Sequence, residues 1–590
     1  MNERSKLQSP SRLELILFLA CIAIAIAPLA LRGTSCGQDF DFHLESWMEA
    51  ARQWHQGVLY PHWIASANYQ AGEPRFVFYP PLSWMLGAIL GIFFPWTWTP
   101  ILFVTICLLA MGAACYKMAC EWMPPATATI AACFYIISPY IFFVIYERSA
   151  CAELLAAAWL PLLVLYALRD KPSMPQLALI IAALWLTDAP AAVMGCYALA
   201  VMVLVASVVQ HRWALLTRAA SAVALGLGLA AVYIIPAVYE QRWVEIDRAI
   251  MPGMRIQDSF LFEHTGMAYH DQVLRTASWI ATFMLIATLF AAIGSFRARK
   301  SQLLLAPLIA LSALIAFMQF PVSKFLWNIA PKLRFLQFPW RWLLVLGLIF
   351  AIFAATALAL GTLNSARKTL NALFVLAFAA VFCVHAWRHF WLFCDDEDNI
   401  HAQITTLYGN GFEGTDEYTP APADNASIQQ NLAPVRVVST PDGDEADSSI
   451  EENPDWQPNE SDLVPAIIQI RRWNVEHMTA EVQTEQPGYA VLRLMDYPAW
   501  RVRINGKPAS RLSGASKTSP PRWRETRMPG RPVRDDGLLV VPISAGTSTI
   551  DVQYTTTPDM WAGRIVSLIS FLIWGTLCFL PNPSRPAGGQ

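Results

Sequence analysis

The chain carries the apolar run Leu13-Glu-Leu-Ile-Leu-Phe-Leu-Ala-Cys-Ile-Ala-Ile-Ala-Ile-Ala-Pro-Leu-Ala-Leu31, and shortly after it the polar stretch Gly37-Gln-Asp-Phe-Asp-Phe-His43. The run is close to the roughly 20 residues that a helix needs to cross a bilayer. If the polar stretch is helical, Asp39 and His43 share one face because they are four residues apart, whereas Asp41 points elsewhere. Ionisable groups at a membrane boundary are costly, so this stretch is a candidate functional site. The alternative is an interfacial helix with a solvated polar face.

The composition indicates a membrane protein. Of 590 residues, 55% are hydrophobic and only 15% are charged, with a mean hydropathy of +0.38. These values exclude an ordinary soluble protein, and the formal net charge of -2 argues against a nucleic-acid partner. Apolar runs of spanning length predict about twelve transmembrane helices. We place them at 13–31, 99–118, 127–146, 150–168, 176–188, 190–210, 214–236, 277–295, 302–319, 341–362, 369–388 and 560–580.

The basic loops predict the orientation. Lys and Arg gather at 169–171, 211–218, 297–300 and 367–368, and all four loops fall on one side if the N-terminus is cytoplasmic. That agreement requires the short apolar segment 82–94 to stay on the outer side without crossing. The first run shows no small-residue cleavage site, so we interpret it as a retained anchor.

The helix predicted at 176–188 is also short. It ends at Asp188-Ala-Pro190, which indicates a broken helix that lines a cavity.

A large hydrophilic segment divides the chain into parts. We predict a transmembrane domain at 1–388 with an outer loop at 32–80, an extracytoplasmic domain at 389–559, and a final helix with a cytoplasmic tail at 560–590. Within the outer domain, alternating or β-rich segments predict an antiparallel β-sandwich at about 460–556. The predicted strands are Leu463–Arg472, His477–Gln483, Ala490–Met495, Trp500–Ile504, Leu538–Ile543 and Thr549–Tyr554.

Two connections within the predicted sandwich are informative. Asn505-Gly506 predicts a tight turn after the fourth strand, and the basic, Pro-rich segment 510–536 predicts a long loop.

Cysteine usage predicts neither zinc nor a disulfide framework. Most of the 11 Cys lie in or beside apolar runs, where they behave as small hydrophobes, and only Cys36 and Cys394 fall clearly outside them.

Two further polar clusters lie on the predicted outer side. Glu147, Arg148 and Glu153 stand between the third and fourth helices, and Glu153 begins a helix, where the dipole favours a carboxylate. The alternative there is a surface ion pair. The segment 332–341 carries Arg334, Gln337 and Arg341, whose donors suit a phosphate or pyrophosphate. The alternative for this segment is an interfacial belt of aromatic and basic residues.

Several motifs carry a resemblance to known families. They are Gly37-x-Asp-x-x-x-His43, Tyr60-Pro-x-Trp63, Gly72-x-Pro-x-Phe-x-Phe-Tyr-Pro-Pro-Leu82, Gln337-Phe-Pro-Trp-Arg341, and Tyr497-Pro-Ala-Trp500 with Asn505-Gly-Lys507. The first four of these motifs resemble the bacterial 6-pyruvoyl-tetrahydropterin-synthase-related membrane protein family. The last one, in the predicted β domain, is similar to the outer domain of the large bacterial membrane proteins implicated in glycosylating cell-wall polymers. An acidic residue after the first helix and a later Pro-Pro-Leu also resemble the C-type-fold (GT-C) glycosyltransferases, which use polyprenyl-phosphate sugars. The 10 His form no zinc cluster of the kind that pterin synthases use, so pterin chemistry is not expected.

The resemblance implies a polytopic α-helical membrane protein, GT-C-like, with a smaller outer antiparallel β-sandwich domain. It implies transfer of a sugar from a polyprenyl-phosphate donor to a glycan, lipid or protein acceptor at the outer face of a bacterial inner membrane. Asp39, His43 and Glu153 are the catalytic candidates. The substrate-binding candidates are Asp41, Trp63, Glu73, Arg75, Tyr79, Glu147, Arg148, Arg334, Gln337 and Arg341.

Metal dependence stays open, because Asp39 has two possible roles. It can act as a general base, or it can hold a divalent ion, Mg²⁺ or Mn²⁺, together with Glu153. A glycolipid or polysaccharide transporter or flippase, and a non-enzymatic cell-envelope assembly protein, are the alternative functions.

Overall fold

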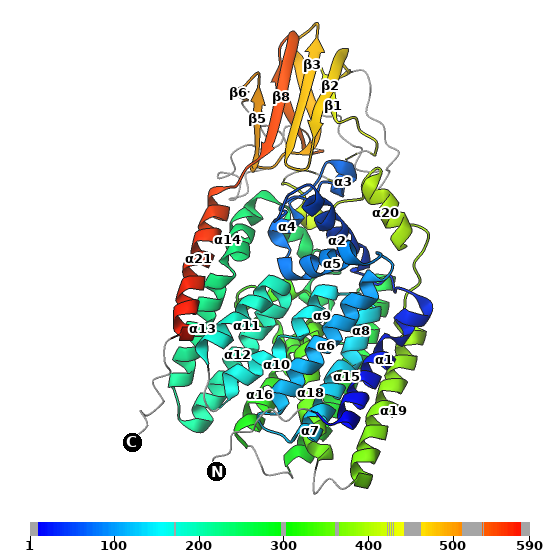
Figure 1. The fold of residues 1–590 in the computed structure, drawn as a ribbon, viewed down its shortest axis with the longest axis vertical. Coiled ribbons are helices and arrows are strands. Elements are labelled where there is room, and N and C mark those ends of the chain that lie inside the picture. The colour runs from blue at the N-terminus through cyan, green and yellow to red at the C-terminus, as the bar shows by residue number, and fades with distance from the viewer. Residues whose placement is uncertain are drawn as a thin grey trace.

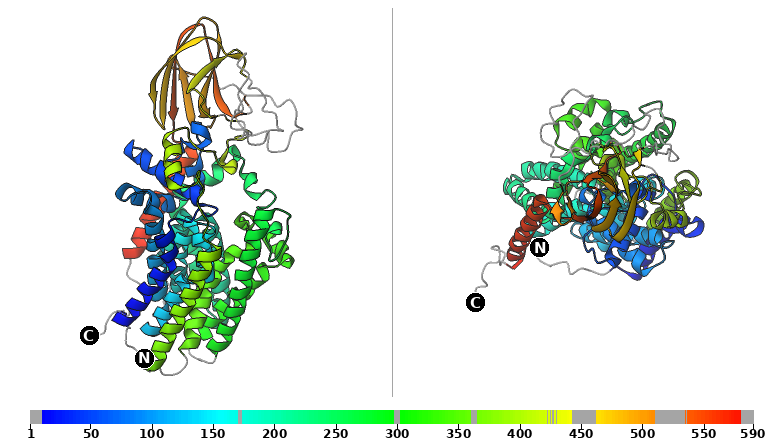
Figure 2. Two further views of the ribbon diagram at one scale, coloured as in Figure 1. Left: turned by 90° about the vertical axis from the view of Figure 1, so that its right-hand side faces the viewer. Right: turned by 90° about the horizontal axis from the view of Figure 1, so that it is seen from above.

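The computed structural model describes residues 10–169, 173–296, 302–359, 365–421, 423, 425, 428, 430–441, 462–509, 534 and 536–579. Helices form a bundle, and strands form a separate domain at one end of it (Figure 1). The short helices α2 to α5 and α20 lie between the two (Figures 1 and 2). We call this end of the bundle the β-domain end. The predicted fold class, a polytopic helical protein with a smaller antiparallel β domain, is confirmed.

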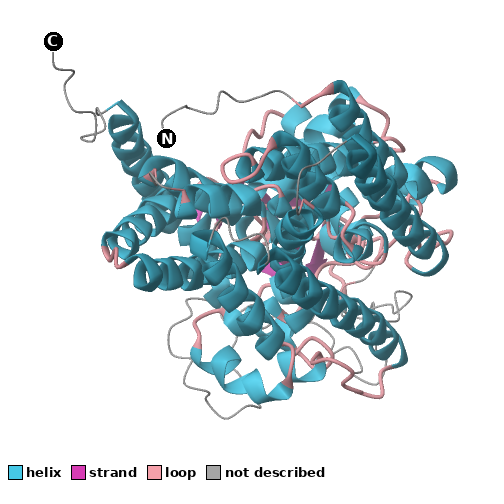
Figure 3. Ribbon diagram, turned by 90° about the horizontal axis from the view of Figure 1, so that it is seen from below, coloured by secondary structure: helices cyan, strands magenta, loops and turns pink. Residues whose placement is uncertain are grey.

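Eight helices among the described residues are long and apolar enough to cross a membrane. They contain α1 (Arg12–Arg32), α6 (Thr99–Ala119), α9 with α10 (Cys151–Ala157 and Leu160–Leu168), α12 (Ala189–Gln210), α15 (Ala268–Phe296), α18 (Leu343–Leu358), α19 (Ser365–His389) and α21 (Pro558–Phe579). Large apolar side chains stay exposed on them, including Phe290 at 69% and Leu568 at 60%. A bilayer accounts for this exposure, because lipid is as apolar as these side chains. Viewed from the other end, the bundle hides most of the strands (Figure 3).

Three pairs of apolar helices are bent at a short break, so each pair is either a broken span or a re-entrant loop. They are α7 (Pro125–Ile136) with α8 (Pro139–Tyr146), bent by 40°; α13 (Ala214–Leu229) with α14 (Ala231–Glu240), bent by 75°; and α16 (Gln302–Met318) with α17 (Lys324–Ile329), bent by 103°. The sequence predicts straight spans at the first two of these places. The first break falls at Ser138-Pro139, where proline favours the end of a helix and the prediction did not use this signal. The second falls within a continuous apolar stretch, and hydropathy alone does not report a change of direction inside a run.

Two apolar helices are shorter than a span. α11 (Met174–Thr187) ends at Asp188, as predicted for a broken helix, and the same residue begins α12. The prediction counts this run as a twelfth span, but α11 has 14 residues and falls below spanning length. α5 (Pro81–Phe93) is the other short helix, in agreement with the prediction that 82–94 does not cross.

The β domain has two antiparallel sheets around one core. The smaller sheet has the order β1-β4-β7 and the larger β2-β3-β8-β5-β6. The strands are β1 (Val435–Val438), β2 (Ala466–Trp473), β3 (His477–Thr484), β4 (Gly488–Met495), β5 (Trp500–Ile504), β6 (Lys507–Pro508), β7 (Leu538–Ile543) and β8 (Gly546–Tyr554). The predicted strands match six of these. β1 precedes the predicted start at about 460, because its four residues are too short a pattern to single out.

The Asn505-Gly506 turn takes the backbone that the sequence predicts. Both residues have positive φ, 50° and 76°, and they connect β5 to β6. Asn and Gly tolerate this conformation best. The predicted long loop 510–536 lies mostly outside the described residues.

The first outer loop packs directly on the β domain. The ring of Trp63 contacts those of Tyr497 and Trp500, with centroids 5.7 and 5.3 Å apart, and its exposed fraction is 1%. Gly72 lies beneath this ring, where a Cβ atom would stand 2.0 Å from the indole nitrogen. The backbone N–H of Met495 donates to the carbonyl of Ala71 at 2.9 Å. The β domain and the loop, which lie far apart in sequence, are therefore joined by packing in one shared core.

Candidate functional site

The loop between α8 and α9 forms one wall of a polar cluster at the β-domain end. Its Ser149 has a positive φ of 50°, which turns the chain sharply after Arg148. The segment before α2 (Phe40–His55) lies along this loop, with the N–H of Gln38 donating to Glu147 O at 3.2 Å and that of Asp39 to Arg148 O at 2.8 Å. Two segments more than 100 residues apart in sequence are thus joined by backbone hydrogen bonds, and Asp39 is brought to Arg148.

Gly37 makes this approach possible. A Cβ atom at Gly37 would lie 2.6 Å from both Glu147 O and Ser149 Oγ. Any larger residue would push the two segments apart.

Arg148 bonds two carboxylates at once. One terminal nitrogen lies 2.6 Å from an oxygen of Glu153, and the other lies 3.0 Å from Oδ2 of Asp39. Arg148 and Glu153 are buried, with exposed fractions of 2% and 4% for their side chains, whereas that of Asp39 is 38% exposed. The guanidinium fork is suited to holding two partners in fixed directions. Asp39 is therefore the member of the trio that solvent or a substrate can reach.

Tyr140 and Arg341 complete the surroundings of Glu153. The Tyr140 hydroxyl donates to the other Glu153 oxygen at 2.6 Å, and the Nε of Arg341 lies 3.8 Å from Glu153. The Arg341 Nε has no hydrogen-bond partner among the described residues. The guanidinium carbon of Arg148 stands 5.1 Å from the Trp340 ring centre, and that of Arg341 stands 5.3 Å from the Phe338 ring centre. Two cations and two aromatic rings thus border one buried carboxylate.

His43 lies behind Asp39 and fixes the start of α9. Its Nε2 accepts a hydrogen bond from the Cys151 N–H at 3.1 Å, which assigns the ring proton to Nδ1. Burial lowers the pKa of His43 to about 4, and Arg148 and Arg75 act in the same direction. The imidazole is therefore neutral at pH 7. No hydrogen bond joins its ring to the Asp39 carboxylate within the part of the chain that the structure describes. The two residues are joined by the hydrogen bond from His43 N–H to Asp39 O at 3.2 Å, and their side chains interact electrostatically.

Tyr79 is the other aromatic neighbour. Its ring centre is 5.9 Å from that of His43 and 4.8 Å from that of Phe42. Tyr79 is half-buried and interacts electrostatically with both Asp39 and Asp188.

Asp188 belongs to the same neighbourhood. Its Oδ1 accepts from the Ala191 N–H at 2.7 Å and so caps α12. The carboxylate also interacts electrostatically with Glu153, Arg341 and Arg148. The break between α11 and α12 thus places another acid close to the cluster.

Glu147 and Asp41 lie at the margins. Burial raises the pKa of Glu147 to about 7, and its carbonyl rather than its side chain contacts the Asp39 segment. Asp41 is exposed, and its carboxylate accepts a hydrogen bond from the adjacent Phe42 N–H at 2.8 Å. α2 therefore turns Asp41 away from Arg148, as its spacing from Asp39 predicts.

Other candidates lie outside the cluster. Trp63 is buried in the interface with the β domain and has no free face for a sugar. Glu73 and Arg75 form a buried pair at 2.6 Å, and the other Glu73 oxygen accepts from the Thr415 N–H at 2.7 Å. This pair holds the first outer loop together, and Arg75 stands over the Phe42 ring at 4.3 Å.

Of the three candidates in the segment before α18, one lies at the cluster and two lie outside it. Arg341 reaches the cluster, whereas Arg334 is exposed and stands 5.2 Å from the Phe335 ring centre. Gln337 has a positive φ of 64° and donates to Ala249 O at 2.7 Å. Its side chain fixes the turn rather than facing Glu153.

The donor set does not fit a divalent metal. The Arg148 guanidinium bonds both Asp39 and Glu153, so a cation shared by these two carboxylates would have to displace another cation. Within the described ranges no group of three or more His, Cys, Asp or Glu is arranged to hold a metal ion.

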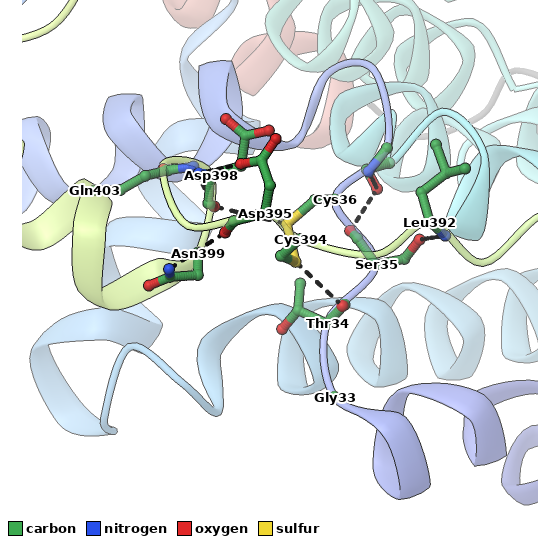
Figure 4. The surroundings of a disulfide bond; sticks show 12 residues. Gly33, Thr34, Ser35, Cys36, Leu392, Cys394, Asp395, Asp398, Asn399 and Gln403 are labelled. Carbon is green, nitrogen blue, oxygen red and sulfur yellow. Dashed lines mark hydrogen bonds between the residues drawn. A yellow bond between two sulfur atoms is a disulfide. The ribbon is translucent and has the colours of Figure 1, made fainter.

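Sequence reasoning did not identify three features of the site. Tyr140 and Asp188 were not candidates, although Asp188 was noted as a helix break. Cys36 and Cys394 form a disulfide across a sequence separation of 358 (Figure 4). No disulfide framework was predicted from the sequence, and this bond corrects that expectation. The position of both cysteines outside the apolar runs was the available signal.

Comparisons with known proteins give partial likenesses of fold. No family model and no curated protein matches the chain. A solved structure of ArnT from Cupriavidus metallidurans bound to undecaprenyl phosphate is similar over 68% of this chain and 78% of that one, at 13% identity and a TM-score of 0.42. The arabinofuranosyltransferase AftD from Mycobacteria is similar over 65% of this chain and 27% of that one, at 17% identity and a TM-score of 0.41. The Archaeoglobus fulgidus oligosaccharyltransferase in the apo form is similar over 72% and 62%, at 12% identity and a TM-score of 0.41.

Proposed function

We propose that this protein is a membrane glycosyltransferase that moves a sugar from a polyprenyl-phosphate donor to an acceptor at the β-domain end of its helices. The observation that carries the proposal is the cluster of Asp39, Arg148, Glu153 and Arg341. It combines one accessible carboxylate with buried cations at the end of helices long enough to span a membrane. The proposed donor is the one used by the GT-C glycosyltransferases, which the sequence motifs resemble.

Asp39 is suited to take the proton from an acceptor hydroxyl. Its Oδ2 is held by Arg148, and within the described residues nothing donates a hydrogen bond to Oδ1. A general base must lie within hydrogen-bond reach of the proton it removes, so a partly exposed carboxylate with one free oxygen meets the requirement.

Arg341 is suited to the departing phosphate. Negative charge grows on that group as the glycosidic bond breaks, and a fixed cation in a low-dielectric site stabilises it. Its side chain is only 11% exposed, and Glu153 lies 3.8 Å away on one side. Phe338 and Trp340 are 9% and 2% exposed and stack on each other, so they form a buried apolar wall that keeps water away from this cation.

The disulfide supports the proposed orientation. Disulfide bonds persist in oxidising compartments and are rare in the cytosol. Cys36 and Cys394 flank the cluster, so we place the cluster and the β domain on the extracytoplasmic side and the start of α1 on the cytoplasmic side. In a bacterium this is the inner membrane, with residues 389–559 facing the periplasm.

Consumption of a lipid-linked donor tests the proposal. The purified chain in nanodiscs is incubated with a panel of short-chain polyprenyl-phosphate sugars and a lipid-extract acceptor, and release of polyprenyl phosphate is followed by chromatography. We expect release by the wild type and a loss of about 10²–10⁴-fold in Asp39→Asn, the typical contribution of a positioned acid–base group. Asp41→Asn is the matched control, because that exposed carboxylate is nearby but turned away. No release from any donor by the wild type, or equal release by Asp39→Asn, contradicts the proposal.

A further inference from the structure

Asp39 lies in a short segment that two other parts of the chain hold from opposite sides. On one side, Gly37 N–H donates to Ser149 Oγ at 3.1 Å, and the backbone of Gln38 and Asp39 donates to the loop between α8 and α9. On the other side, Cys36 N–H donates to Leu392 O at 3.3 Å. The position of Asp39 therefore depends on both neighbours.

The second neighbour is the segment that connects α19 to α20 (Ile400–Tyr408). Ser35 links the two sides, because its Oγ donates to Tyr146 O at 2.7 Å and accepts from the Leu392 N–H at 2.9 Å. The Cys36–Cys394 disulfide is the covalent connection in this arrangement (Figure 4). Only Gly37 and Gln38 separate Cys36 from Asp39, so a displacement of Cys36 is transmitted to the carboxylate.

The rest of the connecting segment is weakly buried. Phe393 is 80% exposed, and Asp395 to Asp398 are exposed as well. Much of the segment therefore contributes little buried apolar area of its own, and such segments open at low free-energy cost. Without the disulfide, the hydrogen bonds of Cys36 and Ser35 to Leu392 would be left to hold it. The contacts of Arg32 and Gly33 with Trp387 and Trp391 would remain as well, at the end of α19.

We propose that the Cys36–Cys394 disulfide positions Asp39 against Arg148, so that the rate of sugar transfer depends on this bond being oxidised; the inference rests on the proposed function. Cys36 and Cys394 are positioning residues, since they act through Asp39. Reduction transfers two electrons and two protons from a dithiol to the bond, which leaves two protein thiols and converts the dithiol to its own disulfide. Both cysteines are half-buried, which gives a small reductant access.

Transfer kinetics before and after reduction test the inference. Wild-type protein in nanodiscs is treated with dithiothreitol, assayed as above, and then reoxidised with diamide. We expect kcat to fall at least about tenfold with little change in the donor KM, and to recover on reoxidation, because small misplacements of a catalytic group cost up to about 10²-fold. Cys36→Ser/Cys394→Ser is the matched control: its rate should equal that of the reduced wild type and should not respond to the reductant.

Two further measurements separate positioning from general support of the fold. In the Asp39→Asn background, reduction should change the residual rate less than about twofold, because two changes that act through one group are not additive. Hydrogen exchange of the amides of Gln38 and Asp39 should be faster after reduction, whereas the strand Trp500–Ile504 should exchange as before. An unchanged kcat with unchanged exchange overturns the inference, and so does an equal loss of rate in both backgrounds. If the wild type consumes no donor, the proposed function fails, and the exchange measurement still decides whether the disulfide positions Asp39.

Discussion

Replacing Arg148 with Lys is expected to slow transfer sharply without unfolding the protein. Arg148 uses two different nitrogens to reach Glu153 at 2.6 Å and Asp39 at 3.0 Å. A Lys side chain keeps the positive charge but presents a single ammonium group, which cannot reproduce both directions. Because Glu153 is buried and Asp39 is partly exposed, the ammonium should stay with Glu153 and release Asp39.

The size of the effect follows from the bond that is lost. A hydrogen bond to a charged group contributes about 1.5–3 kcal/mol. With about 1.4 kcal/mol for each factor of ten, loss of the Asp39 bond corresponds to a decrease of roughly 10- to 150-fold in kcat. Removing the charge altogether is a poorer experiment, because it takes away the cation closest to the buried Glu153, and breaking a buried ion pair costs about 3–5 kcal/mol.

The assay is the initial rate of polyprenyl phosphate release in nanodiscs, normalised to protein that elutes as a single species. Arg471→Lys is the matched control, because its side chain is 57% exposed and pairs with Glu481 on the β domain, far from Asp39 in the fold. Exposed pairs are worth about 0–1 kcal/mol, so this variant should transfer at nearly the wild-type rate. A rate for Arg148→Lys within twofold of the wild type refutes the idea that Arg148 positions Asp39.

Three other predictions follow from the site and the orientation. Gly37→Ala should reduce both expression and transfer, because its Cβ atom would lie 2.6 Å from a backbone oxygen, whereas Gly575→Ala, with open space around it, should behave as the wild type in the same gel-filtration and rate measurements. His43 has a pKa lowered from 6.5 to about 4 by burial, so it contributes stability that is complete above pH 6.5 and is lost as the pH falls toward 4. The loss amounts to about 3 kcal/mol; the apparent melting temperature should therefore fall more steeply over that range in the wild type than in His43→Gln, and parallel curves would contradict the assignment. Lys507→Cys, exposed at the start of β6, should react with an impermeant maleimide in intact cells, and labelling only after lysis would reverse the proposed orientation.

The sequence predicted the elements of the fold well where the signal is local. Strand alternation located β5 and β7 at their observed bounds, and Asn505-Gly506 located the turn between β5 and β6. The apolar runs located the spans, because each needs only a continuous stretch of suitable length. The bend after Leu229 was not predicted, because the apolar pattern continues through it.

The candidate site was predicted only where its signal is local in the sequence. Asp39 and Glu153 attracted attention as charges beside apolar runs, and both lie at the observed cluster. That Arg148 bonds both of them depends on two segments about 110 positions apart in the chain, and no pattern along the chain reports such a distance. Trp63 illustrates the opposite error: an aromatic residue in a polar loop suggested sugar stacking, but it packs beneath the β domain.

The disulfide also bears on how the protein is made. Cys36 leaves the ribosome 358 residues before Cys394. At about 5–20 residues per second, synthesis of that stretch takes on the order of 20–70 s, during which Cys36 has no final partner. In the proposed orientation, export of the connecting segment after α19 therefore precedes closure of the Asp39 segment. A chain whose translation stops before Cys394 would insert many of its helices and still lack the bond. In the proposed orientation, oxidation of this pair therefore marks the chains that have been exported far enough to complete the site.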